Sequence, residues 1–204
     1  ERLDGLHSSQ CLMYSMEFQE VFNLMNAGGW DTLSLLMQKT AAKVKNGGAD
    51  FLLICSNTLH RYASEIEEKI GIPIHGIADA AAQEILKRDI RKVGLLGTKY
   101  AMEGDYYRNT LQDKYGIEVI IPEKKDRELI DSVIFQELCV GIIKQSSRDK
   151  FVDIIDKLRL NGAEAIVLGC TEIPLLIKQE HVSIPVFDTM YLHAVTAVER
   201  ALEA

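Results

Sequence analysis

Two short polar segments in this chain follow apolar runs, and each carries a residue that can move a proton. Residues 56–58 read Ser-Asn-Thr after the apolar run 51–55, and residues 170–172 read Cys-Thr-Glu after the apolar run 165–169. A thiol has a pKa of about 8.5 that its neighbours can tune, while hydroxyl, amide and carboxylate groups supply hydrogen bonds. These residue types at the ends of buried strands suit acid–base or nucleophilic chemistry on a small molecule.

The two segments belong to an internal repeat. Residues 48–56 align without gaps on residues 162–170, and each copy runs from a glycine through an acidic residue and an apolar stretch to the polar segment. The alignment pairs Ser56 with Cys170, whereas Cys55 falls one position earlier. Because ligands of open α/β sheets bind at the carboxyl ends of the strands, we expect two half-chains to present Ser56 and Cys170 to one cleft.

Strands and helices alternate along the chain. Short continuous apolar runs predict strands that are buried on both faces, and apolar residues at i, i+3 and i+4 predict helices. This alternation is typical of a mainly parallel sheet covered by helices, so the chain is predicted to belong to the α/β class. The predicted strands are 11–15, 51–55, 72–74, 92–96, 118–121, 165–169 and 184–187, and the predicted helices are 32–46, one beginning near His60, 79–87, 126–141, 147–161 and 192–202.

Composition narrows the classes of protein and partner. Of the 204 residues, 47% are hydrophobic and 26% are charged, as in an ordinary globular protein. The net charge of −7 argues against nucleic acid or an anionic membrane as a partner, and no apolar run is long enough to span a membrane. The four cysteines show no CxxC and no short His/Cys spacing, so neither a metal site nor a disulfide scaffold is expected, and a reducing cytoplasmic location is predicted.

The repeat also leads to an expectation about the start of the chain. The second half opens with the predicted strand 92–96, and the counterpart of that strand in the first half would lie before residue 1. The first residue is Glu1, and no signal peptide is visible. We therefore expect a strand and a helix to precede Glu1.

The two polar strings together resemble a known family. Residues 55–60 read CSNTLH and residues 169–172 read GCTE, and with GAD at 48–50, GLLGT at 94–98 and PVFD at 185–188 they resemble the aspartate/glutamate racemases that work without pyridoxal phosphate. The resemblance implies two pseudo-symmetric three-layer α/β domains with an interdomain active site, here 1–90 plus 188–204 and 91–187. It also implies a homodimer that needs no cofactor and no metal.

The same resemblance implies the reaction. Members of the family interconvert L- and D-aspartate or glutamate by removing the Cα proton on one face and returning a proton on the other. That transfer needs two acid–base groups on opposite faces, together with donors that hold the carboxylate and the developing carbanion. The catalytic pair implied for this chain is Ser56 and Cys170, with a small amino acid as the substrate.

This chain departs from the family pattern in its first motif. The usual first motif is Cys-Asn-Thr, whereas here the residue before Asn57 is Ser56, and Cys55 lies one position earlier. Neighbouring residues of a strand point to opposite faces, so Cys55 is expected to point away from the direction of Ser56. With a hydroxyl residue at this position, the chain resembles a branch of the family that acts on L-aspartate and L-glutamate. We expect Cys170 to be the stronger base and the two directions of proton transfer to be unequal.

Other residues are expected in or near the site. Asn57, Thr58 and Thr171 can hold a carboxylate, although all three also suit turns and helix caps. Glu172 is implied to lie in the site, and Lys144 is a candidate cation for the distal carboxylate. Cys55 is expected to be buried beside the site, and the remaining two cysteines, Cys11 and Cys139, are expected in the core.

Two other functions remain open at this point. A related enzyme of the hydantoin racemase or maleate isomerase type would use one thiol for covalent attack. A binding protein would keep the cleft and bind a dicarboxylic amino acid without exchanging its Cα proton. The preference between aspartate and glutamate, which differ by one methylene, is left open as well.

Overall fold

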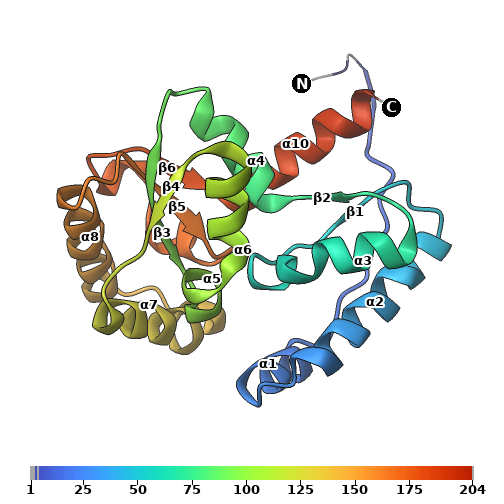
Figure 1. Ribbon diagram of the computed structural model, residues 1–204, viewed down its shortest axis with the longest axis horizontal. Helices are drawn as coiled ribbons and strands as arrows, with labels where there is room; N and C mark the ends of the chain where they lie inside the picture. Colours follow the sequence, from blue (N-terminus) through green and yellow to red (C-terminus); the bar gives the residue numbers. More distant parts are fainter. Residues whose placement is uncertain (1–2, 4, 204) are drawn as a thin grey trace. The chain divides into compact units, whose positions relative to one another are not determined.

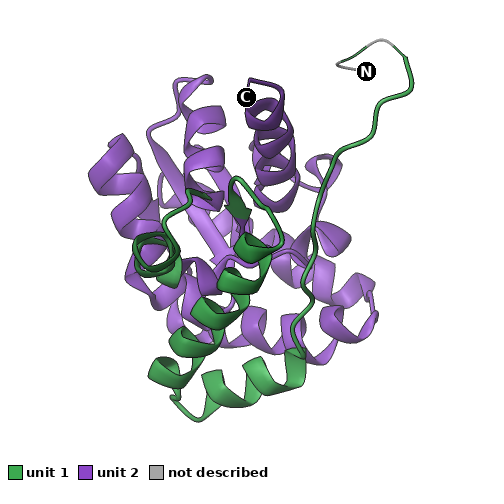
Figure 2. Ribbon diagram, turned by 90° about the vertical axis from the view of Figure 1, so that its right-hand side faces the viewer, with its two compact units in different colours: residues 1–52, 62–74 green, residues 53–61, 75–204 purple. Residues whose placement is uncertain are grey.

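A computed structural model describes residue 3 and residues 5–203 of the chain (Figure 1). The described residues form two compact units (Figure 2). Unit 1 comprises those within 1–52 and 62–74, and unit 2 comprises those within 53–61 and 75–204. Helix α4 (Ile77–Leu86) and the C-terminal helix α10 (Thr189–Glu203) pack against each other and against the sheet of unit 2. The predicted domains, 1–90 plus 188–204 and 91–187, stay a prediction.

Unit 2 is built on a four-stranded parallel sheet. Its strands are β3 (Lys92–Gly97), β4 (Glu118–Ile120), β5 (Ala165–Gly169) and β6 (Val186–Asp188), in the order β4-β3-β5-β6. The two central strands, β3 and β5, are paired over five residues, and the pairing ends with Gly97 opposite Gly169. The residues that follow both strands therefore leave the sheet at the same edge.

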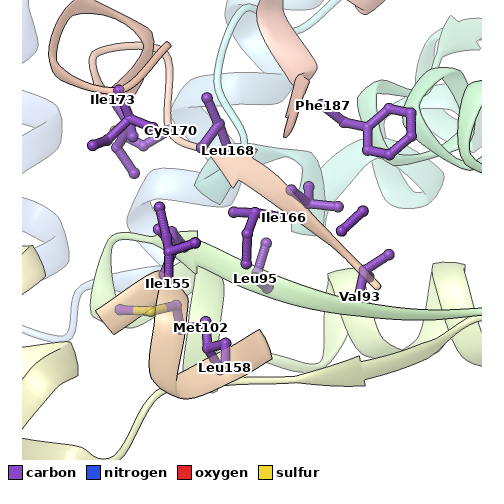
Figure 3. Close-up of a cluster of buried hydrophobic side chains, with 14 of the residues drawn as sticks. Val93, Leu95, Met102, Ile155, Leu158, Ile166, Leu168, Cys170, Ile173 and Phe187 are labelled. Carbon is purple, nitrogen blue, oxygen red and sulfur yellow. The ribbon is translucent and has the colours of Figure 1, made fainter. Parts of the chain in front are cut away.

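Helices cover both faces of this sheet, which explains why its central strands are apolar throughout. Helices α7 (Lys124–Gln136) and α8 (Gln145–Leu160) lie on one side, and α4 and α10 lie on the other (Figure 1). All residues of β5 are buried, as expected for a parallel strand between two helical layers. The buried side chains on and around the two central strands form one continuous core (Figure 3).

Short elements connect the strands of unit 2. They comprise the 3₁₀ helix η1 (Thr58–Tyr62), whose last residue lies in unit 1, α5 (Lys99–Glu103), α6 (Asp105–Arg108), the π-helix η2 (Asn109–Lys114), η3 (Leu138–Val140), α9 (Ile173–Leu176) and η4 (Gln179–His181). Thr98, the residue after β3, caps α5 by accepting a hydrogen bond from Ala101 N at 3.2 Å.

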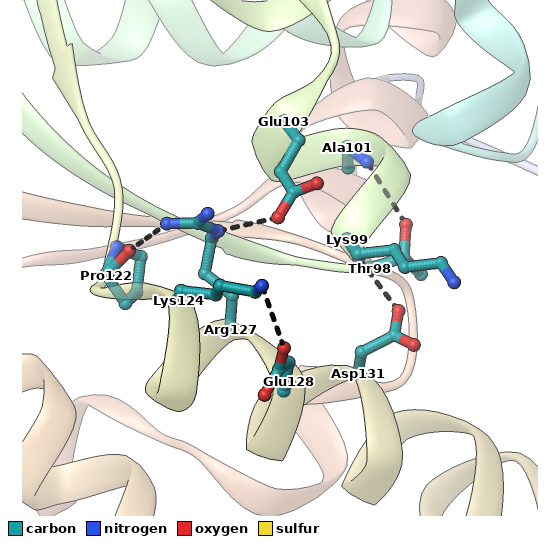
Figure 4. A network of polar contacts seen from close by, with 9 residues as sticks. All are labelled: Thr98, Lys99, Ala101, Glu103, Pro122, Lys124, Arg127, Glu128 and Asp131. Atoms are coloured by element: carbon teal, nitrogen blue, oxygen red, sulfur yellow. Dashed lines mark hydrogen bonds and ion pairs between the residues drawn. The ribbon is translucent and has the colours of Figure 1, made fainter.

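Polar contacts hold α5 against α7 (Figure 4). The Lys99 backbone N–H donates to Asp131 at 2.8 Å, and the Arg127 guanidinium donates to Glu103 at 2.8 Å and to the Pro122 carbonyl at 2.7 Å. These contacts fix α5, the helix that Thr98 caps, against α7.

Unit 1 is mainly helical. Its helices are α1 (Phe18–Asn26), α2 (Trp30–Asn46) and α3 (Ala63–Ile70). Apolar residues on one face of α2 and α3, among them Leu33 and Ile66, are fully buried. The Ser34 hydroxyl of α2 donates to the Glu65 carboxylate of α3 at 2.8 Å.

The structure reproduces the internal repeat in its backbone. Gly48 and Gly162 both adopt a left-handed conformation, with φ of +100° and +93°. Four residues later, the Leu52 N–H donates to the Pro73 carbonyl at 2.9 Å, and the Ile166 N–H donates to the Pro185 carbonyl at 2.8 Å. The two copies thus begin and pair in the same way, although β1 (Leu52–Leu53) and its partner β2 (Ile74–His75) are only two residues long.

The predicted α/β class is confirmed, and so are the strands 92–96 and 165–169 and the helix 32–46. The predicted strand 11–15 is wrong, because these residues have no regular secondary structure and are exposed. The run 51–55 is not buried on both faces, since Leu53 and Cys55 are exposed. Only Leu52–Leu53 form a strand, and among the described residues it pairs with β2 alone. Helices α1, α5 and α6 were not predicted.

The expected burial of three cysteines is also wrong. Cys11, Cys55 and Cys139 are exposed, and only Cys170 is buried among the four. None of the three lies within a long regular element that would carry it into the core, since Cys139 sits in η3 and Cys11 and Cys55 in irregular segments. No helix among the described residues is both long enough and apolar enough to cross a membrane.

The core of β3 allows a direct test of this packing. Leu95 is fully buried between the helical layers, whereas Leu160 at the end of α8 is 76% exposed. We expect Leu95→Ala to lower the free energy of unfolding by about 2–5 kcal/mol because it leaves a cavity. Leu160→Ala should change it by less than about 0.5 kcal/mol. Urea unfolding followed by circular dichroism measures both, and equal effects of the two substitutions would contradict the assigned core.

Candidate functional site

The residue that follows the central strand β5 is a buried cysteine. Cys170 is 6% exposed, and its side chain lies beside those of Leu168 and Ile173 at the end of the core (Figure 3). A Cβ added at Gly169, the residue before Cys170, would come within 2.7 Å of Leu95 Cδ1 and 3.1 Å of the Leu96 carbonyl oxygen, so a larger residue would force its neighbours to shift. Close packing of β5 against β3 therefore delivers the thiol to the carboxyl edge of the sheet.

Two neighbouring side chains share a carboxylate oxygen with this thiol. The Cys170 Sγ donates to Glu172 Oε2 at 3.0 Å, and the Thr171 hydroxyl donates to the same oxygen at 2.8 Å. Burial and the negative charge of Glu172 raise the pKa of Cys170 well above its usual value. The thiol is therefore protonated in this state, with a proton acceptor in direct contact.

The amide of Asn57 lies close to the end of the same strand. Asn57 is 4% exposed, and its Oδ1 accepts a hydrogen bond from the Tyr107 hydroxyl. The Thr189 hydroxyl lies 3.2 Å from Asn57 Oδ1 and donates to the Leu168 carbonyl at 2.8 Å. These contacts connect Asn57 to the end of β5, two residues before Cys170.

The other end of the Asn57 amide has no partner. Among the residues that the structure describes, Asn57 Nδ2 is the one buried side-chain nitrogen or oxygen without a hydrogen bond. An unsatisfied buried donor costs about 1–3 kcal/mol. A ligand with a carboxylate or carbonyl oxygen would remove that cost.

Thr58 contacts the same edge of the sheet at the end of β3, the strand next to β5. Its hydroxyl lies 3.0 Å from the hydroxyl of Thr98, the residue that follows β3. Because Gly97 and Gly169 are paired, Thr98 and Cys170 occupy equivalent places after β3 and β5. The structure thus brings Asn57 and Thr58 to the strand ends that carry Cys170.

Ser56 occupies a turn at the beginning of this segment. Its side chain is half-buried, and its Oγ accepts from the Leu59 N–H at 3.4 Å, as a helix-capping serine does. No hydrogen bond between Ser56 and Cys170 is present among the described residues. The catalytic role of Ser56 therefore stays a prediction, and so does that of the exposed Cys55.

Lys144 forms an ion pair and, among the described residues, no hydrogen bond with Cys170 or Asn57. It precedes α8 and forms an ion pair with Glu137 at 3.0 Å, and the Ser147 hydroxyl donates to the other oxygen of Glu137 at 2.6 Å. These two contacts hold the pKa of Glu137 below its usual value. Binding of a substrate carboxylate by Lys144 stays a prediction.

Three residues of this arrangement were not among the predicted site residues. Tyr107, Thr189 and Thr98 lie 50, 132 and 40 residues from their partners in the 57–58 segment. Thr98 closes the string 94–98, and Thr189 directly follows the string 185–188, so both adjoin motifs that carry the resemblance. Tyr107 has no signal in the sequence, because it lies in the unpredicted helix α6.

The arrangement favours proton transfer to or from a small polar molecule. It combines a buried thiol, a carboxylate in contact with that thiol and an amide with a free donor. Among the described residues, no three His, Cys, Asp or Glu side chains are grouped as metal ligands would be.

Comparison with known proteins points to the same family as the sequence motifs at 55–60 and 169–172. A family model described as Asp/Glu/Hydantoin racemase matches residues 1–197. The chain is similar to a glutamate racemase from Aquifex pyrophilus, with 27% identity over 151 residues that make up 73% of this chain and 56% of that protein. It therefore spans little more than half the length of the curated relative.

Two solved structures resemble the chain over nearly its whole length. One is that of an Asp/Glu racemase candidate from Yersinia pestis, with 44% identity, a TM-score of 0.91 and coverage of 98% of this chain and 87% of the other. The second is an aspartate racemase homologue from Pyrococcus horikoshii, with 36% identity, a TM-score of 0.83 and the same coverage.

The contact between Cys170 and Glu172 can be tested without any substrate. Replacing the carboxylate in Glu172→Gln removes the negative charge that disfavours the thiolate, so the pKa of Cys170 should fall. The rate of alkylation of Cys170 by iodoacetamide, followed across pH by mass spectrometry of its peptide, measures this change. Glu180→Gln, at an exposed position of η4, is the control and should leave the profile unchanged. An unchanged profile in Glu172→Gln would show that the two groups do not interact.

Proposed function

The chain belongs to the Asp/Glu/Hydantoin racemase family, and on that basis we propose that it is a racemase of acidic amino acids that works without a cofactor. The substrate would be aspartate or glutamate, and the reaction a proton transfer at Cα with inversion. The observation that carries the proposal is the buried Cys170 thiol in hydrogen-bond contact with Glu172 at the carboxyl end of β5.

The thiol and carboxylate together supply a base of adjustable strength. Burial favours the neutral thiol in the free protein. When the ammonium group of an amino acid enters the site, its positive charge favours the thiolate, and the thiol proton can pass from Sγ to Glu172 Oε2 over the 3.0 Å contact. The Cys170 thiolate then takes the Cα proton of the substrate, and its S–H bond is restored.

The negative charge that develops on the substrate needs donors. Asn57 Nδ2 has an unused N–H, and its carbonyl end is held by Tyr107, so the amide can donate to the substrate carboxylate without reorganising. The Thr58 and Thr98 hydroxyl pair offers further hydrogen bonds at the same edge. These groups would stabilise the carbanion as its charge spreads onto the carboxylate.

The proton that is returned to Cα would come from the Ser56 hydroxyl, on the face of the substrate opposite Cys170. The proton moves from Ser56 Oγ to Cα, and Ser56 recovers a proton from water. A hydroxyl is a much weaker acid than a thiol and, being neutral, a much weaker base than a thiolate, so the transfer at Ser56 is expected to be the slower of the two. We therefore propose that the enzyme treats L- and D-substrates unequally, with Cys170 serving one face and Ser56 the other.

Proton NMR in D₂O tests the proposed reaction directly. L-aspartate and L-glutamate are incubated separately with the protein, and loss of the Cα–H signal is followed together with the appearance of the D-enantiomer. Loss of signal with inversion is expected for at least one of the two substrates. Cys170→Ala should slow exchange by about 10²–10⁴-fold because it removes the principal base.

Matched substitutions assign the second face. Ser56→Ala should abolish inversion while leaving single-sided exchange at Cys170, whereas Cys55→Ala should leave both intact. The reverse result would assign the second transfer to Cys55. Binding without exchange would instead identify a binding protein, and a covalent adduct on Cys170 detected by mass spectrometry would identify the hydantoin racemase or maleate isomerase type of chemistry.

The role of the Asn57 amide leads to a separate expectation. In Asn57→Asp the Tyr107 hydroxyl keeps an acceptor, but a carboxylate replaces the donor that would face the substrate. Loss of a hydrogen bond to a charged group should raise KM by about tenfold or more. Asn109→Asp, at an exposed position, is the control. A KM unchanged in Asn57→Asp would rule out the amide as the carboxylate donor.

A further inference from the structure

Three histidines pack together behind the Ser56 turn within unit 2. The ring centroid of His193 lies 5.3 Å from that of His60 and 5.5 Å from that of His75, and the rings of His75 and His193 are stacked. His60 and His193 are buried, and His75 is half-buried. None of these histidines belongs to the proton-transfer apparatus described above.

The partners of His60 determine its protonation state. Its Nδ1 lies 2.7 Å from the Ser56 carbonyl oxygen, which can only accept, so Nδ1 carries the proton. Its Nε2 accepts a hydrogen bond from the Ile77 backbone N–H at 3.2 Å, so Nε2 carries none. Only the neutral Nδ1–H tautomer satisfies both contacts.

The two contacts of His60 join two distant segments. Ser56 precedes Asn57 and Thr58 in the turn, and Ile77 is the first residue of α4, whose N-cap Gly76 offers no side chain. His60 thus caps the N-terminus of α4 with one nitrogen and holds the main chain of Ser56 with the other.

The other two histidines support this tautomer. His193 Nε2 lies 2.7 Å from the His75 carbonyl, so it donates there, and His75 Nε2 lies 2.7 Å from the Thr196 hydroxyl. That hydroxyl donates in turn to the Leu192 carbonyl at 2.9 Å, so His75 Nε2 is the donor to Thr196. The His75 carbonyl oxygen lies 3.5 Å from His60 Nε2, at the limit of a hydrogen bond, and it accepts the much shorter bond from His193 Nε2 at 2.7 Å.

Burial favours the neutral form of the three histidines, and the charged groups around them act in both directions. Burial lowers the pKa of His60 and His75, and it lowers that of His193 to about 4. Asp79 of α4 opposes this effect on His60 and His75, while Arg200 of α10 reinforces it on His75. The Tyr106 ring of α6, centred 5.6 Å from that of His60, has a raised pKa and is neutral.

We propose that neutral His60 is a positioning residue that holds the Ser56–Asn57–Thr58 turn against the N-terminus of α4 in the arrangement needed for catalysis. This inference rests on the proposed racemase function for its kinetic readout. A second proton on Nε2 places an N–H against the Ile77 N–H, so protonation breaks the link and releases the turn. Because the neutral form is required, activity falls as the pH drops through the pKa of His60, below its usual range.

Two substitutions of His60 distinguish the effect of its hydrogen bond to the Ser56 carbonyl from the effect of filling its position with a side chain. In His60→Asn, an amide N–H replaces Nδ1–H toward the Ser56 carbonyl and does not titrate. In His60→Leu, both contacts are lost. His181→Asn, which changes a histidine outside the cluster, is the control.

The rate of inversion of the preferred L-substrate, which needs the Ser56 turn, is measured from pH 4 to pH 9. His60→Leu is expected to lower kcat by up to about 10²-fold and to raise KM, because release of the turn displaces both Ser56 and the Asn57 donor. His60→Asn should recover most of kcat and lose the acidic limb of the profile that the wild type and His181→Asn share. A wild-type kcat and pH profile in His60→Leu would overturn the proposal, as would an acidic limb that persists in His60→Asn.

Nitrogen-15 NMR of the histidine rings gives a readout that needs no activity. The expected spectrum shows one histidine locked as the Nδ1–H tautomer, assigned to His60 by its disappearance in His60→Asn. The Asn57 and Ile77 amide signals should shift at the same pH at which this ring is protonated. If no acidic amino acid is racemised but these signals behave as expected, the proposed function fails and the positioning of the turn stands. An Nε2–H tautomer at His60 overturns the positioning role whatever the activity.

Discussion

The close approach of β3 and β5 at their carboxyl ends is the constraint on which the site depends. A Cβ on Gly97 would come within 2.7 Å of the Gly169 carbonyl oxygen, so neither strand can be pushed away without losing the pairing at this point. Thr98 and Cys170 therefore leave the sheet side by side. Two sets of polar contacts connect the 56–58 segment to these strand ends: Thr58 contacts Thr98, and Asn57 contacts Thr189, whose hydroxyl donates to the Leu168 carbonyl of β5.

The parts of the fold that were predictable are those whose burial is complete. Strands 92–96 and 165–169 are apolar because helices cover both faces, and that environment leaves a clear signal in the sequence. The run at 11–15 is similarly apolar in sequence, but it is exposed and pairs with no strand among the described residues. An apolar run predicts a strand only where a partner exists, and the identity of the partner is not a local property.

The site divides in the same way. Cys170 and Glu172 are two residues apart, so their string could suggest their contact, and Asn57 belongs to the polar segment 56–58 that follows the first copy of the repeat. Tyr107 and Thr189, which hold the Asn57 amide, are brought to it by the packing of α6 and α10. Nothing in the local sequence of Tyr107 distinguishes it from a core tyrosine, because its role depends on one hydroxyl meeting one amide across 50 residues.

The two copies of the repeat have kept the backbone and diverged in chemistry. Both begin with a left-handed glycine and pair at equivalent residues, yet one ends in a buried thiol beside a carboxylate and the other in a serine whose main chain is held by a neutral histidine. A carboxylate can receive a proton from its neighbour, whereas His60 has both nitrogens occupied and cannot take one without breaking a contact. In the proposed reaction the Ser56 side would therefore hold position and the Cys170 side would exchange protons, and this difference is the physical basis for expecting unequal transfer at the two faces.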